Sequence, residues 1–162
     1  MASWIDISTA TPDFAAAVER SFAHGKHKVM ATLRADGSPR VSGTEVDFRW
    51  GEFWLGSMPG ARKAHDLQRD PRVAVHGPTI DESMSVGDAK LSGRAIEITD
   101  PAEFARYRAD LADAKDGEVP DGPFHLFRLD ITEAVRTWVE DAALMVESWH
   151  PDSGYVRIER RD

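Results

Sequence analysis

Hydrophobic and polar residues alternate with a period of two along most of the chain, which is typical of half-buried β-strands. The alternation predicts short strands at residues 28–33, 40–48, 52–56, 72–76, 89–98 and 124–139, and a terminal hairpin made of residues 142–149 and 155–159. Tight turns such as residues 35–39 join neighbouring strands, and this favours antiparallel meanders over a parallel, doubly wound sheet. The pattern therefore predicts a barrel with helical appendages.

Three segments show helical spacing instead. Residues 11–24 begin with Thr-Pro-Asp, which combines a capping hydroxyl, a proline at the first helical position and an acid in the first turn. Helices are also predicted at residues 61–69 and 100–111, and an acidic loop at 114–122. We expect one mainly β domain over residues 1–162, with an N-terminal helix at about 11–24 and a barrel core at about 27–162.

Composition narrows the possible partners. The chain of 162 residues is 41% hydrophobic and 30% charged, with a formal net charge of −8. Nucleic-acid binding usually needs a broad basic face, so we expect no nucleic-acid partner. A local basic pocket is still compatible with this balance, and Arg40, Arg62, Lys63 and Arg72 could form one.

Several kinds of chemistry are excluded or disfavoured by the residues present. The chain has no cysteine, which rules out disulfides, zinc–thiolate sites and thiol nucleophiles. Its six histidines show no metal-ligand spacing, and we expect no metal site. No apolar run approaches membrane-spanning length and no leader pattern opens the chain, so a cytoplasmic protein without a membrane partner is expected.

The most informative local feature is an Arg-Lys pair at the start of a predicted helix. Arg62 and Lys63 follow an aromatic strand and a Gly/Ser/Pro loop that begins at Gly56 and Ser57. Cations normally avoid a helix N-terminus because the helix dipole makes that end positive. Two cations beside free backbone N–H groups indicate a bound anion, such as a cofactor phosphate; a solvated, slightly unfavourable helix start is the alternative.

The order of these segments resembles the pyridoxamine 5′-phosphate oxidase-like, FMN-binding split β-barrel superfamily. Residues 31–42 resemble the first hairpin of that family, and residues 53–57, 61–67 and 70–75 are similar to its phosphate-binding segment. The resemblance implies a six-stranded antiparallel split β-barrel and a homodimer with cofactor sites at the subunit interface. It covers residues 28–98 closely and the C-terminal strands loosely.

The resemblance also implies roles for particular residues. Arg62 and Lys63 match the pair that grips the cofactor phosphate, and Arg40 matches a second-strand arginine that reaches the same phosphate. The other implied cofactor-binding residues are Val41, Ser42 and Gly43 along the ring system, Gly56 and Ser57 in the closing loop, and Trp138, donated by the other subunit.

Two departures from the true oxidase bear on the substrate. Glu45 occupies the position of a lysine, and residues 144–149 lack the arginine- and histidine-rich substrate signature of that enzyme. We therefore expect an oxidoreductase other than a pyridoxamine phosphate oxidase. It would transfer hydride between FMN and a small conjugated organic molecule, with no side chain acting as a nucleophile.

Three alternatives stay open at this stage. A branch of the superfamily uses the deazaflavin coenzyme F420, whose acidic tail could follow a basic track through Arg34, Arg69 and Arg72. A flavin-binding protein without turnover is the second alternative. The third is haem binding, which would need an axial ligand such as His76 or His150.

Overall fold

The computed structural model describes residues 2–114, 119 and 122–161. It contains four helices and eight strands in these residues, in the order α1 (Trp4–Ala10), α2 (Pro12–Ala23), β1 (Lys28–Leu33), β2 (Pro39–Arg49), β3 (Glu52–Ser57), α3 (Arg62–Arg69), β4 (Arg72–His76), β5 (Asp88–Glu97), α4 (Pro101–Ala114), β6 (His125–Glu140), β7 (Ala143–His150) and β8 (Gly154–Arg160). Among these residues, no helix is long and apolar enough to cross a membrane.

Six of the strands close into an antiparallel barrel. The strand order is β3-β2-β1-β4-β5-β6, and β3 pairs with β6 to complete the ring, with Leu55 opposite Phe127. This closure confirms the expected six-stranded antiparallel barrel and the mainly β class. Because the ring is closed, each of the six strands pairs with a neighbour on both sides.

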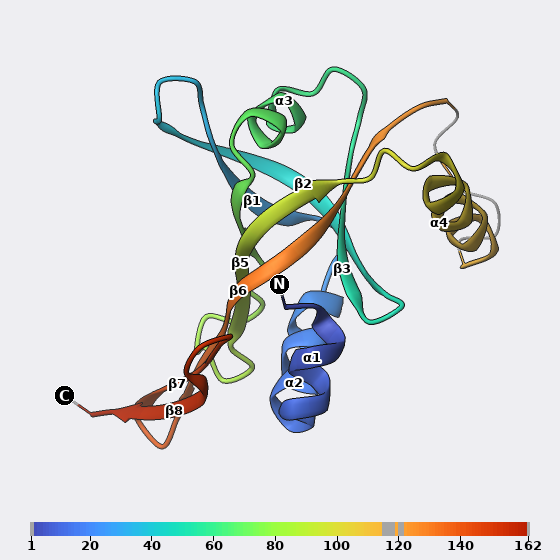
Figure 1. Cartoon of the computed structure of the whole chain (residues 1–162). Coiled ribbons are helices and arrows are strands. Elements are labelled where there is room, and N and C mark those ends of the chain that lie inside the picture. Colours follow the sequence, from blue (N-terminus) through green and yellow to red (C-terminus); the bar gives the residue numbers. More distant parts are fainter. Residues whose placement is uncertain (1, 115–118, 120–121, 162) are drawn as a thin grey trace.

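The barrel interior is filled by alternate residues of each strand. Phe53 and Leu55 of β3 point into the main core, whereas Trp54 between them faces outward and packs against α4. The helices α1 and α2 cover one end of the barrel, and α3 lies at the other (Figure 1). At the α2 end, the ring of Phe22 lies 5.5 Å from that of Phe53 and 5.7 Å from that of Phe48.

The strand β6 belongs to two parts of the molecule. Its first residues, from His125 to Arg128, pair with β3 and close the barrel, and its last residues, from Ala134 to Glu140, pair with β7. The hairpin of β7 and β8 therefore projects away from the barrel (Figure 1). A register shift in β5 at Gly93 lies along the β5–β6 pair, where a Cβ would come within 2.1 Å of a backbone oxygen of β6.

The structure differs from the sequence prediction mainly at the N-terminus. The expected helix at residues 11–24 is present as α2, but α1 before it was not predicted. The helix α1 has only seven residues, and its start is set by the carboxylate of Asp6, which accepts hydrogen bonds from the backbone and hydroxyl of Ser3. Residues 115–118 and 120–121 of the predicted acidic loop lie outside the described residues.

Candidate cofactor and substrate groove

A groove of about 910 Å³ runs along the outside of the barrel, between the β2–β3 pair and α4. Pockets for small molecules usually measure about 300–1,000 Å³, so this groove is large enough for a cofactor together with part of a substrate. Its lining residues are Lys26, His27, Gly43, Thr44, Glu45, Val46, Asp47, Arg49, Trp54, Gly56, Ser57, Met58, Pro59, Lys63, Tyr107, Leu111, Ala114, Pro123 and Phe124.

The alternation of β2 explains the floor of the groove. Even-numbered residues such as Val46 and Phe48 pack against the core, so the odd-numbered residues from Gly43 to Arg49 face outward. Because a strand rises about 3.3 Å per residue, these outward positions span roughly 20 Å. We call the part beside α3 the near end and the part beside α4 the far end.

The near end brings together a lysine, a serine and two bare stretches of backbone. The ammonium of Lys63 donates a hydrogen bond of 2.6 Å to the carbonyl of Gly43. Burial lowers the pKa of Lys63, and the carboxylate of Glu45 opposes that shift. A Cβ built on Gly43 or on Gly56 would meet no atom within 4 Å, so the space above both backbones is open.

The hydroxyl of Ser57 at this end is buried and lacks a hydrogen-bond partner among the described residues. A buried polar group left unsatisfied costs about 1–3 kcal/mol, and such groups are uncommon in native proteins. The residue lines the groove, and an acceptor on a bound anion would satisfy its hydroxyl. The donor set of Lys63 and Ser57 therefore fits a phosphate.

Arg40 is held beneath α3 by a buried carboxylate. Its Nε donates to Asp66 at 2.6 Å, and the same carboxylate accepts from the hydroxyl of Thr32 at 2.9 Å and from Arg69 at 3.2 Å. Burial raises the pKa of Asp66, but the three hydrogen bonds together lower it below its ordinary value. Arg40 thus fixes α3 to the barrel in this structure and does not line the groove.

The other predicted residues are more scattered. Arg62 begins α3 and is exposed, and Val41 is 71% exposed on the outer face of β2, next to Ser42. Trp138 packs in a separate cluster with Met145, on the half of β6 that pairs with β7. Within one chain, the structure therefore brings together Gly43, Gly56, Ser57 and Lys63 but leaves Trp138 outside the groove.

The far end is made of residues that were not predicted as a site. Trp54, Tyr107 and Leu111 form one buried cluster, and the indole and phenol rings lie 5.1 Å apart. Phe124 packs against the edge of this cluster, just before β6. The alternation of β2 could have indicated the outward-facing Asp47, but no local signal places α4 against β3.

Charged groups at the far end are linked across the groove. The guanidinium of Arg49 donates to Asp47 at 2.8 Å and also pairs with Asp110 of α4. Burial raises the pKa of Tyr107, the carboxylate of Asp47 raises it further, and the guanidinium of Arg49 opposes this shift. Closer to the middle, Lys26 lies 3.4 Å from Glu45 in an exposed pair.

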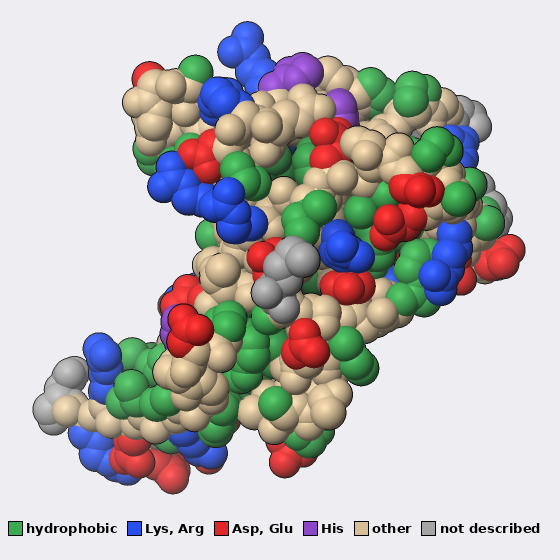
Figure 2. Space-filling view, in the orientation of Figure 1, with side chains coloured by type: hydrophobic (Ala, Val, Ile, Leu, Met, Phe, Trp, Pro, Cys, Tyr) green, Lys and Arg blue, Asp and Glu red, His purple; other side chains and the backbone are tan. Residues whose placement is uncertain are grey.

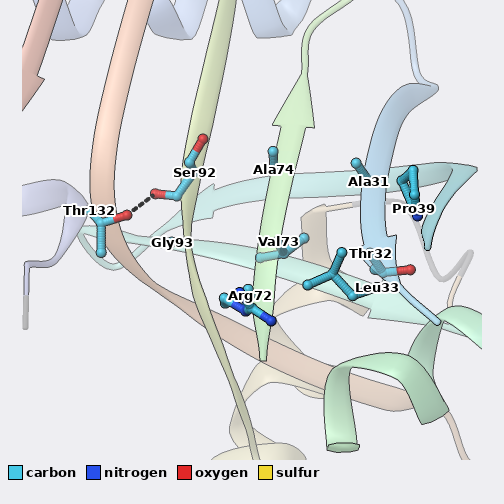
Figure 3. Close-up of a pocket in the computed structure, with 10 residues that line it drawn as sticks. All are labelled: Ala31, Thr32, Leu33, Pro39, Arg72, Val73, Ala74, Ser92, Gly93 and Thr132. Carbon is cyan, nitrogen blue, oxygen red and sulfur yellow. Dashed lines mark hydrogen bonds between the residues drawn. The ribbon is translucent and has the colours of Figure 1, made fainter. Parts of the chain in front are cut away.

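A second, smaller hollow lies on the outer face of β1, β4 and β5. It has a volume of about 340 Å³, and Figure 3 shows Arg72, Val73 and Ala74 of β4 along it. It contains none of the predicted cofactor residues, and the guanidinium of Arg72 is paired with Asp70 at 2.6 Å. Arg72 therefore does not join Lys63 in a common basic pocket.

The surface charge agrees with the sequence balance. Figure 2 shows basic and acidic side chains interspersed over one face of the molecule, without a broad basic area on that face. In the part of the chain that the structure describes, no cluster of three or more histidine or acidic side chains is placed to hold a metal ion.

Comparison with known proteins identifies the family. The family model described as pyridoxamine 5′-phosphate oxidase matches residues 15–138. No curated protein matches the chain.

Solved structures with this fold cover most of the chain. A pyridoxamine 5′-phosphate oxidase-related, FMN binding protein from Nostoc punctiforme is 15% identical, with a TM-score of 0.65 over 98% of this chain and 100% of that one. PhzG from Burkholderia lata, in complex with tetrahydrophenazine-1-carboxylic acid, is 13% identical, with a TM-score of 0.63 over 97% and 92%. A protein described as an F420 reductase is 19% identical, with a TM-score of 0.54 over 72% and 94%.

These structural similarities are below 25% identity and concern the fold, whereas the family model spans most of the sequence. Its match contains the whole β2-to-α3 segment from which the near end of the groove is built. The chain is therefore a member of the pyridoxamine 5′-phosphate oxidase family, with that family's FMN-binding split-barrel fold.

Proposed function

We propose that the chain is an oxidoreductase that binds FMN in the groove and reduces or oxidises a small conjugated organic molecule. The observation that carries the proposal is the near end of the groove, where Lys63 and the unpartnered hydroxyl of Ser57 lie beside the open backbone of Gly43 and Gly56. Proteins with the same fold that are described as an FMN binding protein and as an F420 reductase support it.

The residues of the near end would hold the phosphate and position the ring. Lys63 and Arg62 supply positive charge at the first turn of α3, where backbone N–H groups also favour an anion. The bare backbone at Gly43 and Gly56 leaves room for a flat ring along β2 and β3. Bound flavin supplies the capacity to take up and release hydride; the chain supplies binding, orientation and exclusion of water.

The proposed roles of Arg40, Val41, Ser42 and Trp138 depend on further contacts. Arg40 would reach the phosphate through the guanidinium nitrogens that do not bond Asp66. Val41 and Ser42 continue the strand from Gly43.

Trp138 could join the site only from a second copy of the chain, because it does not line the groove of its own chain. We therefore include a homodimer in the proposal. Val41 and Val29, which are 71% and 49% exposed, support it, because a partner would cover these apolar side chains of β2 and β1.

The three arginines that could bind the acidic tail of F420 already form contacts within the chain. This supports FMN over F420 as the cofactor. The guanidinium of Arg34 donates to the carbonyl of Pro39 at 2.7 Å, Arg69 pairs with Asp66, and Arg72 pairs with Asp70. A track that binds an acidic tail would have to break these contacts. Coenzyme F420 is the alternative cofactor in our proposal.

Haem is the weaker alternative because the two candidate axial ligands lie elsewhere. Nδ1 of His76 donates to the carbonyl of Gly77 at 2.6 Å, its Nε2 lies 3.4 Å from Asp88, and His150 lies 3.7 Å from Glu133. Neither histidine lines the groove. A flavin-binding protein without turnover shares the same site and differs only in the absence of activity with any substrate.

The phosphate grip can be tested by comparing FMN with riboflavin, which has the same ring but no phosphate. We expect the double variant Arg62→Ala/Lys63→Ala to weaken FMN binding by about 3 kcal/mol, roughly a hundredfold, because two charge-assisted contacts are lost. Riboflavin affinity should change little. The measurement is quenching of flavin fluorescence on titration with protein, repeated with F420.

A matched control removes two exposed cations outside the groove, as in Arg20→Ala/Arg94→Ala on α2 and β5. This variant should bind FMN like the unmodified chain. Equal FMN affinity in all three proteins, or an equal loss for riboflavin, would contradict the site assignment.

A further inference from the structure

The two ends of the groove carry opposite charge. At the near end the charged side chain is the ammonium of Lys63. At the far end, one guanidinium, Arg49, lies between two carboxylates, Asp47 and Asp110, which leaves a net charge of −1 on this cluster. Between the ends, Glu45 and Lys26 offset each other in an exposed pair.

The far end also has an apolar wall. Leu111 of α4 and Phe124 just before β6 line it, and Trp54 and Tyr107, which are 1% and 5% exposed, form its buried base. The half-buried ring of Phe124 can form favourable stacked or tilted contacts with a flat ligand. A wall of this composition suits a conjugated ring.

An anionic group would be poorly accommodated beside this wall. The guanidinium of Arg49 already pairs with both carboxylates, so an anion would have to displace one of them or remain uncompensated in a partly dehydrated site. A neutral or cationic ring would not have to displace a carboxylate from Arg49, and it would not add an uncompensated negative charge.

We propose that the far end is the substrate subsite and that it selects flat neutral or cationic molecules over anionic ones. The inference rests on the proposed function, since it places the cofactor at the near end of the same groove. It names Asp47 and the α4 wall as the specificity determinants. Phosphorylated or carboxylated substrates would bind poorly at this subsite.

The test uses three probes with one ring system and different charge: 2-naphthylmethylamine, 2-naphthalenemethanol and 2-naphthoate. Binding to the protein is measured by calorimetry at neutral pH and low salt, both with and without saturating FMN. We expect the amine to bind at least about tenfold more tightly than the carboxylate, with the alcohol between them. Naphthoate binding as tightly as the amine would overturn the inference.

Two variants locate the effect. Asp47→Asn removes one of the two carboxylates while Arg49 keeps its contact with Asp110, and we expect naphthoate affinity to rise about five- to tenfold. Asp152→Asn, at an exposed position in the β7–β8 turn, changes the net charge by the same amount and should leave all three affinities unchanged. A rise of the same size in both variants would overturn the role of Asp47.

The apolar wall is tested separately with Leu111→Ala. Shortening this side chain should weaken all three probes by a similar factor, about three- to tenfold, without changing their order. Unchanged affinities would overturn the location of the subsite at α4. FMN affinity is measured in the same samples: FMN binding without the charge order refutes only the inference, whereas charge order without FMN binding refutes only the proposed function.

Discussion

The near and far ends of the groove share one strand pair but are built in different ways. The near end is assembled from residues close in sequence, because Gly43, Gly56 and Lys63 lie on β2, the adjoining β3 and the helix that follows. The far end depends on a long-range contact, in which Tyr107 of α4 packs on Trp54 of β3. The near end can therefore be predicted from a sequence motif, whereas the far end cannot.

The two ends also differ in what holds them together. At the near end, α3 is fixed to the barrel by the buried carboxylate of Asp66 and its three donors. At the far end, α4 is fixed mainly by apolar packing, and the Arg49–Asp110 pair is added at its rim. The stability of the far end should thus depend mainly on side-chain volume, and the stability of the near end on charge.

The largest expected effect is on the packing of α4. Replacing Trp54 with alanine removes a side chain that is 1% exposed, and we expect the free energy of unfolding to fall by about 3–5 kcal/mol. Urea denaturation followed by circular dichroism measures this value. Trp54→Phe, which keeps part of the ring contact with Tyr107, should lose clearly less. A loss below about 1 kcal/mol for alanine would mean that α4 is not anchored through this residue.

A smaller effect is expected when the charge that fixes α3 is removed. Asp66→Asn keeps the volume of the side chain but weakens its hydrogen bonds with Arg40, Arg69 and Thr32, which should lower the free energy of unfolding by about 2 kcal/mol. Urea denaturation at pH 7 gives the value. Asp70→Asn is the control, because that carboxylate pairs with Arg72 at the surface. An equal loss in both variants would contradict the buried role of Asp66.

The sequence predicted the barrel strands well because alternation and tight turns are local features of the chain. Alternation and tight turns located the barrel strands to within one or two residues at each end, for example residues 40–48 against Pro39–Arg49 for β2. Gly43, Glu45 and Asp47 alternate along the predicted strand, and all three line the groove. The predicted strand ended one residue before Arg49, which was therefore not considered for the site.

The sequence could not place side chains whose partners are distant along the chain. Arg40 was predicted to bind phosphate, but its contact with Asp66 depends on how α3 sits on the end of the barrel. The outward contact of Trp54 with α4 needs a helix that begins more than forty residues later in the chain. The role of Trp138 stays a prediction, because it concerns a second copy of the chain.

The smallest effect is a pH dependence that should separate the two ends. The pKa of Asp66 is lowered in the folded protein, so its stabilising contribution is complete above the ordinary aspartate pKa of 3.8 and is lost as the pH falls through the lowered value. The difference in stability between the unmodified chain and Asp66→Asn should thus be largest at neutral pH and shrink toward zero in acid. Urea denaturation of both proteins from pH 7 to about pH 2 measures it. Trp54→Phe removes no ionisable group, so its difference from the unmodified chain should stay nearly constant over that range. A constant difference for Asp66→Asn as well would show that the near end, like the far end, is held by packing and not by charge.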